Sequence, residues 1–304
     1  MIQGLLYMLT ASALFAAMGG FVYQVRLWDQ NASAMTASFI RVVVNLIFVW
    51  IIASRNGLGR GILDLFGDMR WSLWARGFFG TLSVMGMFSA IHMIGLGEAS
   101  FLHAFNAVWI AALSPFVLGQ PNSRLGWLAI GLGLVGLYLV YQPELGGDAL
   151  TGRSLALASG AFAGTAYMMI ARAGRSNPPL TVVFYFCLVA TMIHLAWFYV
   201  NGIIWPVDGR SWLMLIGSGL FASVAQIFMT KAYQIAPAAF ISAVSYSTPI
   251  FNLLVSIFIF ALMPNAQSLV GALLVVVAGV ALPYLQGRMR ASSGREIPVE
   301  VTDR

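Results

Sequence analysis

Residues 98–116 read EASFLHAFNAVWIAALSPF, a stretch in which apolar side chains dominate although His103 and Asn106 stand in its middle, one helical turn apart. The stretch approaches the roughly 20 residues that an α-helix needs to cross a bilayer. Nine more apolar runs of similar length occur along the chain, with glycine, proline, asparagine and charged residues between them. The ten runs lie near residues 3–25, 33–53, 73–95, 98–118, 124–141, 152–172, 179–200, 211–232, 236–262 and 265–285. We therefore expect an all-α integral membrane protein with ten transmembrane helices.

The composition excludes a soluble protein, because 60% of the 304 residues are hydrophobic and only 9% are charged, against roughly 25% charged residues in a soluble domain. A cytoplasmic N-terminus leaves only Arg26, Arg153 and Arg210 in outer loops, and it places Arg76 among the cytoplasmic residues. We expect a multi-pass protein of the cell (inner) membrane with both termini in the cytoplasm. The net charge of +6 then reflects topology, and nucleic-acid binding is not needed to explain it.

The chain also repeats itself in a consistent order. A shift of 147 residues lays ASALFAA (11–17) on ASGAFAG (158–164). A shift of 139 residues lays EASFLHA (98–104) on PAAFISA (237–243). Because several such pairings keep the same order along the chain, we interpret them as a duplication of a five-span unit.

The duplication predicts the domain organisation. We expect a first five-helix repeat at 1–142, a second at 150–286, and a disordered cytoplasmic tail at 287–304. A second copy of a unit with an odd number of spans enters the membrane upside down. Inverted repeats of this kind surround a central cavity in many secondary transporters, which expose it to each side of the membrane in turn.

These features resemble a known family. Ten spans in two repeats, Arg41 within FIRVVVNL of the second span, and the paired segments GEASFLHAF and APAAFISAVSYSTPIF are similar to the drug/metabolite transporter superfamily. Within it, the chain most resembles EamA-type exporters of amino acids and metabolites, especially aromatic amino acids, in bacteria. The resemblance implies export and a monomer. One departure is that Pro249 aligns with Ile110, so the two halves need not bend alike.

The repeat gives a reason for the two polar residues of the opening stretch. By the shift of 139, His103 maps to Ser242 and Asn106 maps to Ser245, which Tyr246 follows. Neutral polar groups avoid lipid, so we expect both clusters to face a central cavity and bind substrate. The alternative is that they link neighbouring helices by hydrogen bonds worth about 0.6 kcal/mol each.

Further candidate substrate-binding residues come from other spans. Phe15 and Phe162 form an aligned aromatic pair that lines the cavity or, as we favour, packs in the core. Met85, His92 and Gln226 lie on the third and eighth spans. A neutral, aromatic and methionine-rich lining favours an uncharged or zwitterionic cargo that is partly apolar.

Arg41 lies about 12 Å into the membrane, where an unpaired cation is costly. It either binds a substrate carboxylate or, as we favour, bridges helices through backbone carbonyls. All ten acidic residues fall in loops, at span ends or in the tail. Proton and sodium sites usually use such groups, so we favour facilitated diffusion, although His92 or His103 could relay a proton.

Taken together, the sequence predicts a facilitative exporter of amino acids or similar small neutral metabolites, aromatic or hydrophobic ones above all. Proton-coupled efflux of another metabolite or drug class is the alternative. An enzyme is disfavoured because G-x-S-x-G and H-E-x-x-H are absent and the three histidines stand on separate spans. We expect no metal and no cofactor, and the partners are a small-molecule substrate and the lipid bilayer.

Overall fold

A computed structural model of the protein describes residues 2–29, 32–55, 61–119, 123–141, 150–260 and 265–278. These residues form helices joined by short connections, and no strand occurs among them. The elements are α1 (Ile2–Trp28), α2 (Ala34–Arg55), the 3-10 helix η1 (Gly61–Phe66), α3 (Trp71–His103), α4 (Asn106–Leu118), α5 (Arg124–Tyr141), α6 (Leu150–Ala173), α7 (Pro179–Asn201), α8 (Gly209–Ile235), α9 (Ala238–Val244), α10 (Ser247–Phe260) and α11 (Ala266–Val276). The tail expected at 287–304 lies outside the described residues.

Eight stretches of these helices are long and apolar enough to cross a membrane. Helix α3 bends at Gly95, whose φ is 84°, and the part from Glu98 onward forms one such stretch together with α4. Helix α5 offers a shorter apolar stretch, Arg124–Leu139, and α11 has 11 residues. The expectation of an all-α membrane protein is confirmed, while the count of ten spans stays a prediction.

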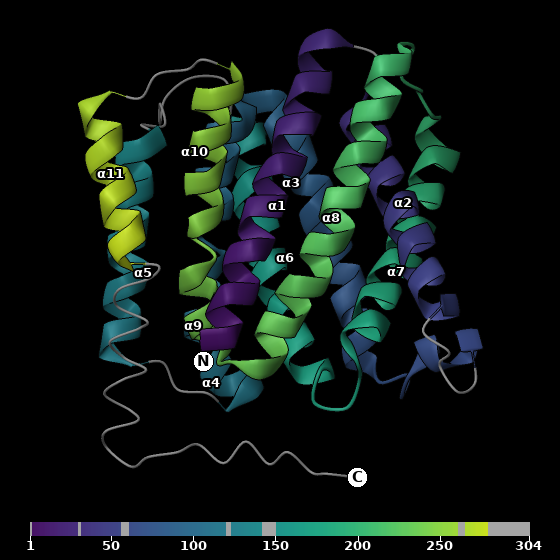
Figure 1. Ribbon diagram of the computed structural model, residues 1–304, viewed down its shortest axis with the longest axis horizontal. Coiled ribbons are helices and arrows are strands. Elements are labelled where there is room, and N and C mark those ends of the chain that lie inside the picture. Colours follow the sequence, from purple (N-terminus) through teal and green to yellow (C-terminus); the bar gives the residue numbers. More distant parts are fainter. Residues whose placement is uncertain are drawn as a thin grey trace.

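Helices from the two halves of the chain lie against each other. Helix α3 packs along α6, and α1 packs along α8 (Figure 1). Helices α5 and α11 lie together at one edge of the molecule, and α2 and α7 lie together at the opposite edge. Glycine permits the closest approaches, since a Cβ atom at Gly160 of α6 would stand 2.7 Å from the carbonyl oxygen of His103.

The fourth and ninth spans are both interrupted near their middle. Residues 104–105 separate α3 from α4, and residues 245–246 separate α9 from α10. Pro249 follows the second break, and it cannot donate a helical hydrogen bond to the carbonyl group of Ser245, four residues earlier. The first break occurs with Ile110 at the position aligned with that proline, so the two spans are broken in both halves despite this difference.

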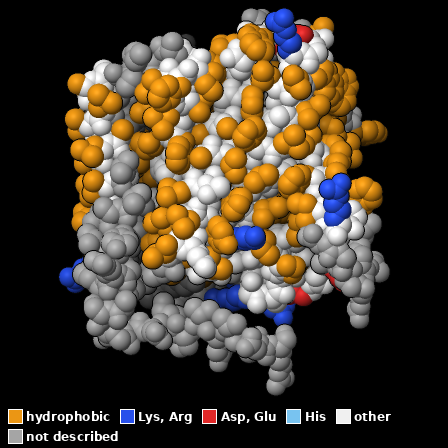
Figure 2. Space-filling model, in the orientation of Figure 1, with side chains coloured by type: hydrophobic (Ala, Val, Ile, Leu, Met, Phe, Trp, Pro, Cys, Tyr) orange, Lys and Arg blue, Asp and Glu red, His pale blue; other side chains and the backbone are white. Residues whose placement is uncertain are grey.

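Apolar side chains also cover the outside of the bundle. Phe116, Phe258 and Leu273 are exposed, together with many other large hydrophobic residues. Figure 2 shows hydrophobic side chains over most of the described surface in that view, with few charged ones among them. Soluble monomers rarely expose continuous apolar patches larger than a few hundred Å², so this is a surface for lipid.

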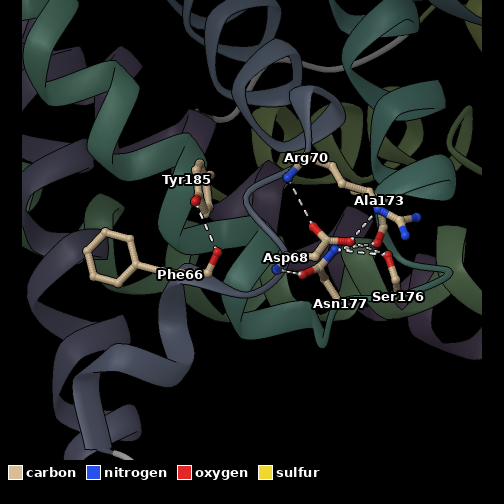
Figure 3. A network of polar contacts seen from close by, with 7 residues as sticks. All are labelled: Phe66, Asp68, Arg70, Ala173, Ser176, Asn177 and Tyr185. Atoms are coloured by element: carbon tan, nitrogen blue, oxygen red, sulfur yellow. Dashed lines mark hydrogen bonds and ion pairs between the residues drawn. The ribbon is translucent and has the colours of Figure 1, made fainter.

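Polar side chains gather at the end of the bundle where α3 begins and α6 ends (Figure 3). The Ser176 hydroxyl donates to Asp68 Oδ2 at 2.6 Å, and the Asp68 backbone N–H donates to Asn177 Oδ1 at 3.1 Å. Asn177 Nδ2 donates to the carbonyl oxygen of Ala173 at 3.1 Å. We call Asp68, Ser176 and Asn177, with Arg70 and Gln234 described next, the Asp68 network.

The remaining members tie this network to two more helices. Arg70 Nε pairs with Asp68 Oδ2 at 3.0 Å, and Gln234 Nε2 at the end of α8 donates to the carbonyl oxygen of Asn177 at 3.1 Å. Burial alone would raise the pKa of the Asp68 carboxyl, but hydrogen bonds from Ser176 and Asn177 and the charge of Arg70 outweigh it. The pKa of Asp68 is therefore lowered from its ordinary 3.8.

Candidate functional site

A cavity of about 160 Å³ lies inside the bundle, and its walls come from both halves of the chain. The first half supplies residues of α1, α2, α3 and α4, and the second half supplies residues of α6, α7, α8 and α10 and the 245–246 break. One water molecule needs roughly 10–15 Å³, so the space suffices for a small organic molecule. Seven residues singled out from the sequence line it: Phe15, Arg41, His103, Asn106, Gln226, Ser245 and Tyr246.

Four other candidates do not line this cavity. The Ser242 hydroxyl is buried and donates to the Ala239 carbonyl oxygen at 2.9 Å. The Phe162 ring is half-buried, and its centroid lies 6.2 Å from that of the Phe79 ring. His92 Nδ1 lies 3.0 Å from the carbonyl oxygen of Phe88, and Met85 is buried elsewhere.

The polar clusters of the fourth and ninth spans make matching hydrogen bonds at the two helix breaks. Asn106 Nδ2 donates to the carbonyl oxygen of His103 at 2.9 Å. At the aligned positions, Ser245 Oγ donates to the carbonyl oxygen of Ser242 at 2.6 Å. Because a break frees carbonyl groups from their helical partners, these side chains serve the backbone as well as lining the cavity.

His103 presents an acceptor to the cavity. Its Nδ1 lies 2.8 Å from Ser159 Oγ, and that hydroxyl already donates its proton to the Ala156 carbonyl oxygen at 2.7 Å. The hydroxyl therefore accepts from His103, so Nδ1 carries the ring proton and Nε2 of the neutral imidazole keeps its lone pair. His103 lines the cavity through a neutral ring that can accept a hydrogen bond from a ligand.

Arg41 is 3% exposed and lines the cavity from α2. Its guanidinium carbon lies 5.9 Å from the Phe88 ring centroid and 6.0 Å from that of Phe186. Among the described residues, its Nε has no hydrogen-bond partner. Nε therefore makes no bridge to a backbone carbonyl among the described residues, while the guanidinium carbon lies near two aromatic rings. The choice between a bridging and a carboxylate-binding role for Arg41 stays a prediction.

Arg76, which was counted among the cytoplasmic residues from the sequence, is buried inside the bundle. It is 2% exposed and lines the same cavity from the first turns of α3. Its Nη2 donates to Gln226 Oε1 at 3.0 Å, and its guanidinium carbon lies 4.6 Å from the Phe186 ring centroid. The signal was present, since Arg76 falls within the apolar run at 73–95 and required the same scrutiny as Arg41.

No acidic side chain lines the cavity among the described residues. Glu98 pairs with Arg153 at 2.6 Å near one end of the bundle, and Asp29 Oδ2 accepts from the backbone of Val207 at 2.9 Å. The described residues also hold no group of three or more metal-ligating side chains. The cavity thus offers cationic and neutral polar groups beside apolar walls.

Comparisons with known proteins agree with this architecture. Residues 2–142 and 150–283 match the EamA-like transporter family. The chain is 24% identical over 282 residues to the pseudopaline exporter CntI of Pseudomonas aeruginosa, covering 92% of this chain and 95% of that protein. It is 23% identical over 285 residues to the riboflavin transporter of Vibrio cholerae, with 91% of each chain covered.

A human relative and a solved structure extend the comparison. Solute carrier family 35 member G1 of Homo sapiens is 26% identical over 291 residues, which cover 91% of this chain and 78% of that protein. One crystal structure superposes with a TM-score of 0.72 at 18% identity, covering 94% of this chain and 98% of the other, and so shares the fold. Since the family match spans most of its length, the chain belongs to the EamA-like transporter family.

Proposed function

We propose that the protein moves amino acids or similar small organic molecules across the cell membrane by alternating access, as a facilitative exporter. The observation that carries this proposal is the cavity, whose polar lining comes from both halves of the chain at the two helix breaks. A cargo held there contacts both halves at once. Movement of one half against the other then changes the side on which the cargo is released.

The helix packing supports the inverted duplication on which this mechanism depends. Under the shifts of the sequence analysis, α1 corresponds to α6 and α3 corresponds to α8. If each helix is replaced by its counterpart in the other half, the α3–α6 pair becomes the α8–α1 pair. Helices α1 and α8 are also closely packed in the structure. The same replacement leaves the α2–α7 and α5–α11 pairs unchanged, because each of these pairs joins a helix to its own counterpart. This pattern is the one expected of two repeats related by a pseudo-twofold axis.

The groups that line the cavity suit an amino-acid-like cargo. Arginine binds a carboxylate through paired N–H donors, and the free acceptor of His103 suits a donor such as an ammonium group. Phe15 and Met18 supply apolar wall for a side chain. We infer that the protein works as a monomer with both termini in the cytoplasm.

Proton-coupled efflux of another metabolite or drug is the second candidate. His103 favours it, because a neutral imidazole in the cavity is able to take up a proton. We favour facilitated diffusion, because no carboxylate lines the cavity among the described residues. The names of the relatives span a pseudopaline exporter and a riboflavin transporter, so an organic cargo with polar groups is common to both candidates.

Counterflow into proteoliposomes tests the proposal. Vesicles preloaded with unlabelled phenylalanine, methionine and glutamate receive the same solutes in labelled form, without an ion gradient. Gly19 lines the cavity, and Gly19→Leu should block exchange by filling it. Gly131→Leu is the matched control, since a side chain at Gly131 meets open space. Equal exchange by both variants and the parent protein would contradict a pathway through the cavity.

A further inference from the structure

Two arginine side chains share one wall of the cavity. The guanidinium carbons of Arg41 and Arg76 lie 6.0 Å and 4.6 Å from the centroid of the same ring, that of Phe186. They cannot be farther apart than the sum of these two distances. Both side chains are at least 97% buried and line the cavity, so two positive charges lie at one small space inside the bundle.

Neither charge is balanced by the protein in the part of the chain that the structure describes. The ion pairs recorded there join Arg70 to Asp68 and Arg153 to Glu98, away from the cavity. The Nε donors of Arg41 and Arg76 are buried and have no hydrogen-bond partner among the described residues. A buried cation without an anion is strongly unfavourable inside a membrane, so this pair of arginines favours binding of an anionic ligand.

The fold also makes room for this arrangement. A Cβ atom at Gly80, one turn after Arg76, would overlap Arg76 Nη1. Gln226 accepts from Arg76 Nη2 at 3.0 Å and so fixes one side of the guanidinium while Nε remains free. The absence of a side chain at Gly80 thus leaves space for the Arg76 guanidinium group, and the hydrogen bond to Gln226 holds that group in place.

The two positive charges of Arg41 and Arg76 indicate how many negative charges the cargo carries. A neutral amino acid brings one carboxylate and one ammonium group, so it leaves the net charge of the two arginines unchanged. A molecule with two acidic groups neutralises both, and guanidinium groups bind carboxylates especially well. Resting on the function proposed above, we propose that Arg41 and Arg76 form an anion-binding subsite, and that the cargo is an organic anion with two carboxylates.

Binding of a matched series tests this assignment directly. Succinate, succinamate and succinamide share one skeleton and carry two, one and no carboxylates. We expect thermal stabilisation of the purified protein to decrease in that order. Equal stabilisation by all three, or stabilisation by none, overturns the assignment.

Substitutions test whether succinate binds at the two arginines. Arg41→Gln and Arg76→Gln should each weaken succinate binding by about tenfold or more, and Gly80→Ala should weaken it by displacing the Arg76 side chain. Arg172→Gln removes the same charge from an exposed side chain, and Gly131→Ala adds the same methyl group in open space. These two controls should bind succinate as the parent protein does. Loss of succinate binding in the controls also overturns the assignment.

Transport separates this inference from the proposed function. In counterflow, glutamate should exchange faster than glutamine, which has the same size but one carboxylate fewer. If Gly19→Leu blocks exchange but glutamine and glutamate exchange at the same rate, the cavity carries cargo and the anion assignment is wrong. If succinate binding depends on both arginines but no solute exchanges, the anion subsite stands and transport is wrong.

Discussion

Polar side chains of the Asp68 network have hydrogen-bond partners within the protein, whereas several polar atoms around the cavity have none among the described residues. In the network, Asp68 and Asn177 each take part in several hydrogen bonds, so α3, α6 and α8 are joined at one end of the bundle (Figure 3). In the cavity, buried polar atoms remain without partners in the described part of the chain. These atoms are Nε of Arg41 and Arg76, Oδ1 of Asn106 and the Tyr246 hydroxyl.

This difference teaches how to separate structural polar groups from binding groups. A buried polar atom without a hydrogen-bond partner lowers the stability of the folded protein by about 1–3 kcal/mol. Four such atoms around one cavity are therefore strongly destabilising. A ligand in the cavity could complete these four groups, whereas other unpartnered buried atoms, such as those of Asn45 and Ser12, do not line the cavity. The Asp68 network therefore supports the fold, whereas the cavity presents polar groups that a cargo is able to bind.

The largest expected effect concerns the two arginines. The double variant Arg41→Gln/Arg76→Gln should lose anion exchange by about 100-fold, because both charges that hold the cargo are gone. The same change should raise the melting temperature of the cargo-free protein by about 2 °C or more, since an unbalanced buried charge is removed. Counterflow and thermal unfolding measure the two effects, and a lowered melting temperature would mean that the arginines are structural.

Asn177→Ala should show the opposite pattern. It removes hydrogen bonds to Asp68 and Ala173, and we expect it to destabilise the protein by about 1–3 kcal/mol. Binding of succinate by the folded variant should be unchanged, because Asn177 does not line the cavity. Thermal unfolding with and without succinate measures both, and a loss of succinate binding at unchanged stability would contradict the division between the two regions.

The two helix breaks should respond alike. Asn106→Ala and Ser245→Ala each delete one of the matching hydrogen bonds to the carbonyl oxygens of His103 and Ser242. We expect each to destabilise the protein by about 0.6 kcal/mol, the average for such bonds in a membrane. Unfolding in denaturing detergent measures this, and strongly unequal effects would show that the breaks are not equivalent.

The smallest effect concerns pH at the Asp68 network. Because the pKa of Asp68 is lowered on folding, its stabilising contribution is fully present above the unfolded value of 3.8 and is lost as pH falls through the lower folded value. Asp68→Asn should therefore melt below the parent protein at pH 7. The two should converge once the pH has fallen below the folded pKa of Asp68, and a difference that persisted there would assign the effect to something other than the charge.

Much of the fold was predictable because lipid imposes it. The apolar runs at 98–118 and 179–200 coincide closely with helices, since backbone polar groups in a bilayer must bond within their own segment. The repeat also placed His103, Asn106 and Ser245 at one cavity. Ser242 does not line the cavity, and its predicted contact with substrate remains untested.

The arginines show where sequence reasoning failed. Arg76 was counted among the cytoplasmic residues because loops on the cytoplasmic side carry an excess of lysine and arginine. The residue, however, stands inside an apolar run and not in a loop. Its role depends on Gly80 and Gln226, and the latter comes from a helix 150 residues later in the chain. A contact over such a separation depends on tertiary packing, which neither spacing nor composition reveals.

Accessibility of one cysteine in the cavity and one in the Asp68 network tests the central claim most directly. Cys187, the single native cysteine, is buried and is replaced by serine to clear the background. Ser245→Cys and Ser176→Cys are then exposed to a membrane-impermeant thiol reagent from either side of the membrane. We predict that position 245, in the cavity, reacts from both sides in turn, while position 176, exposed at one end, reacts from one side only. Reaction of position 245 from a single side, with or without cargo, would contradict alternating access through this cavity.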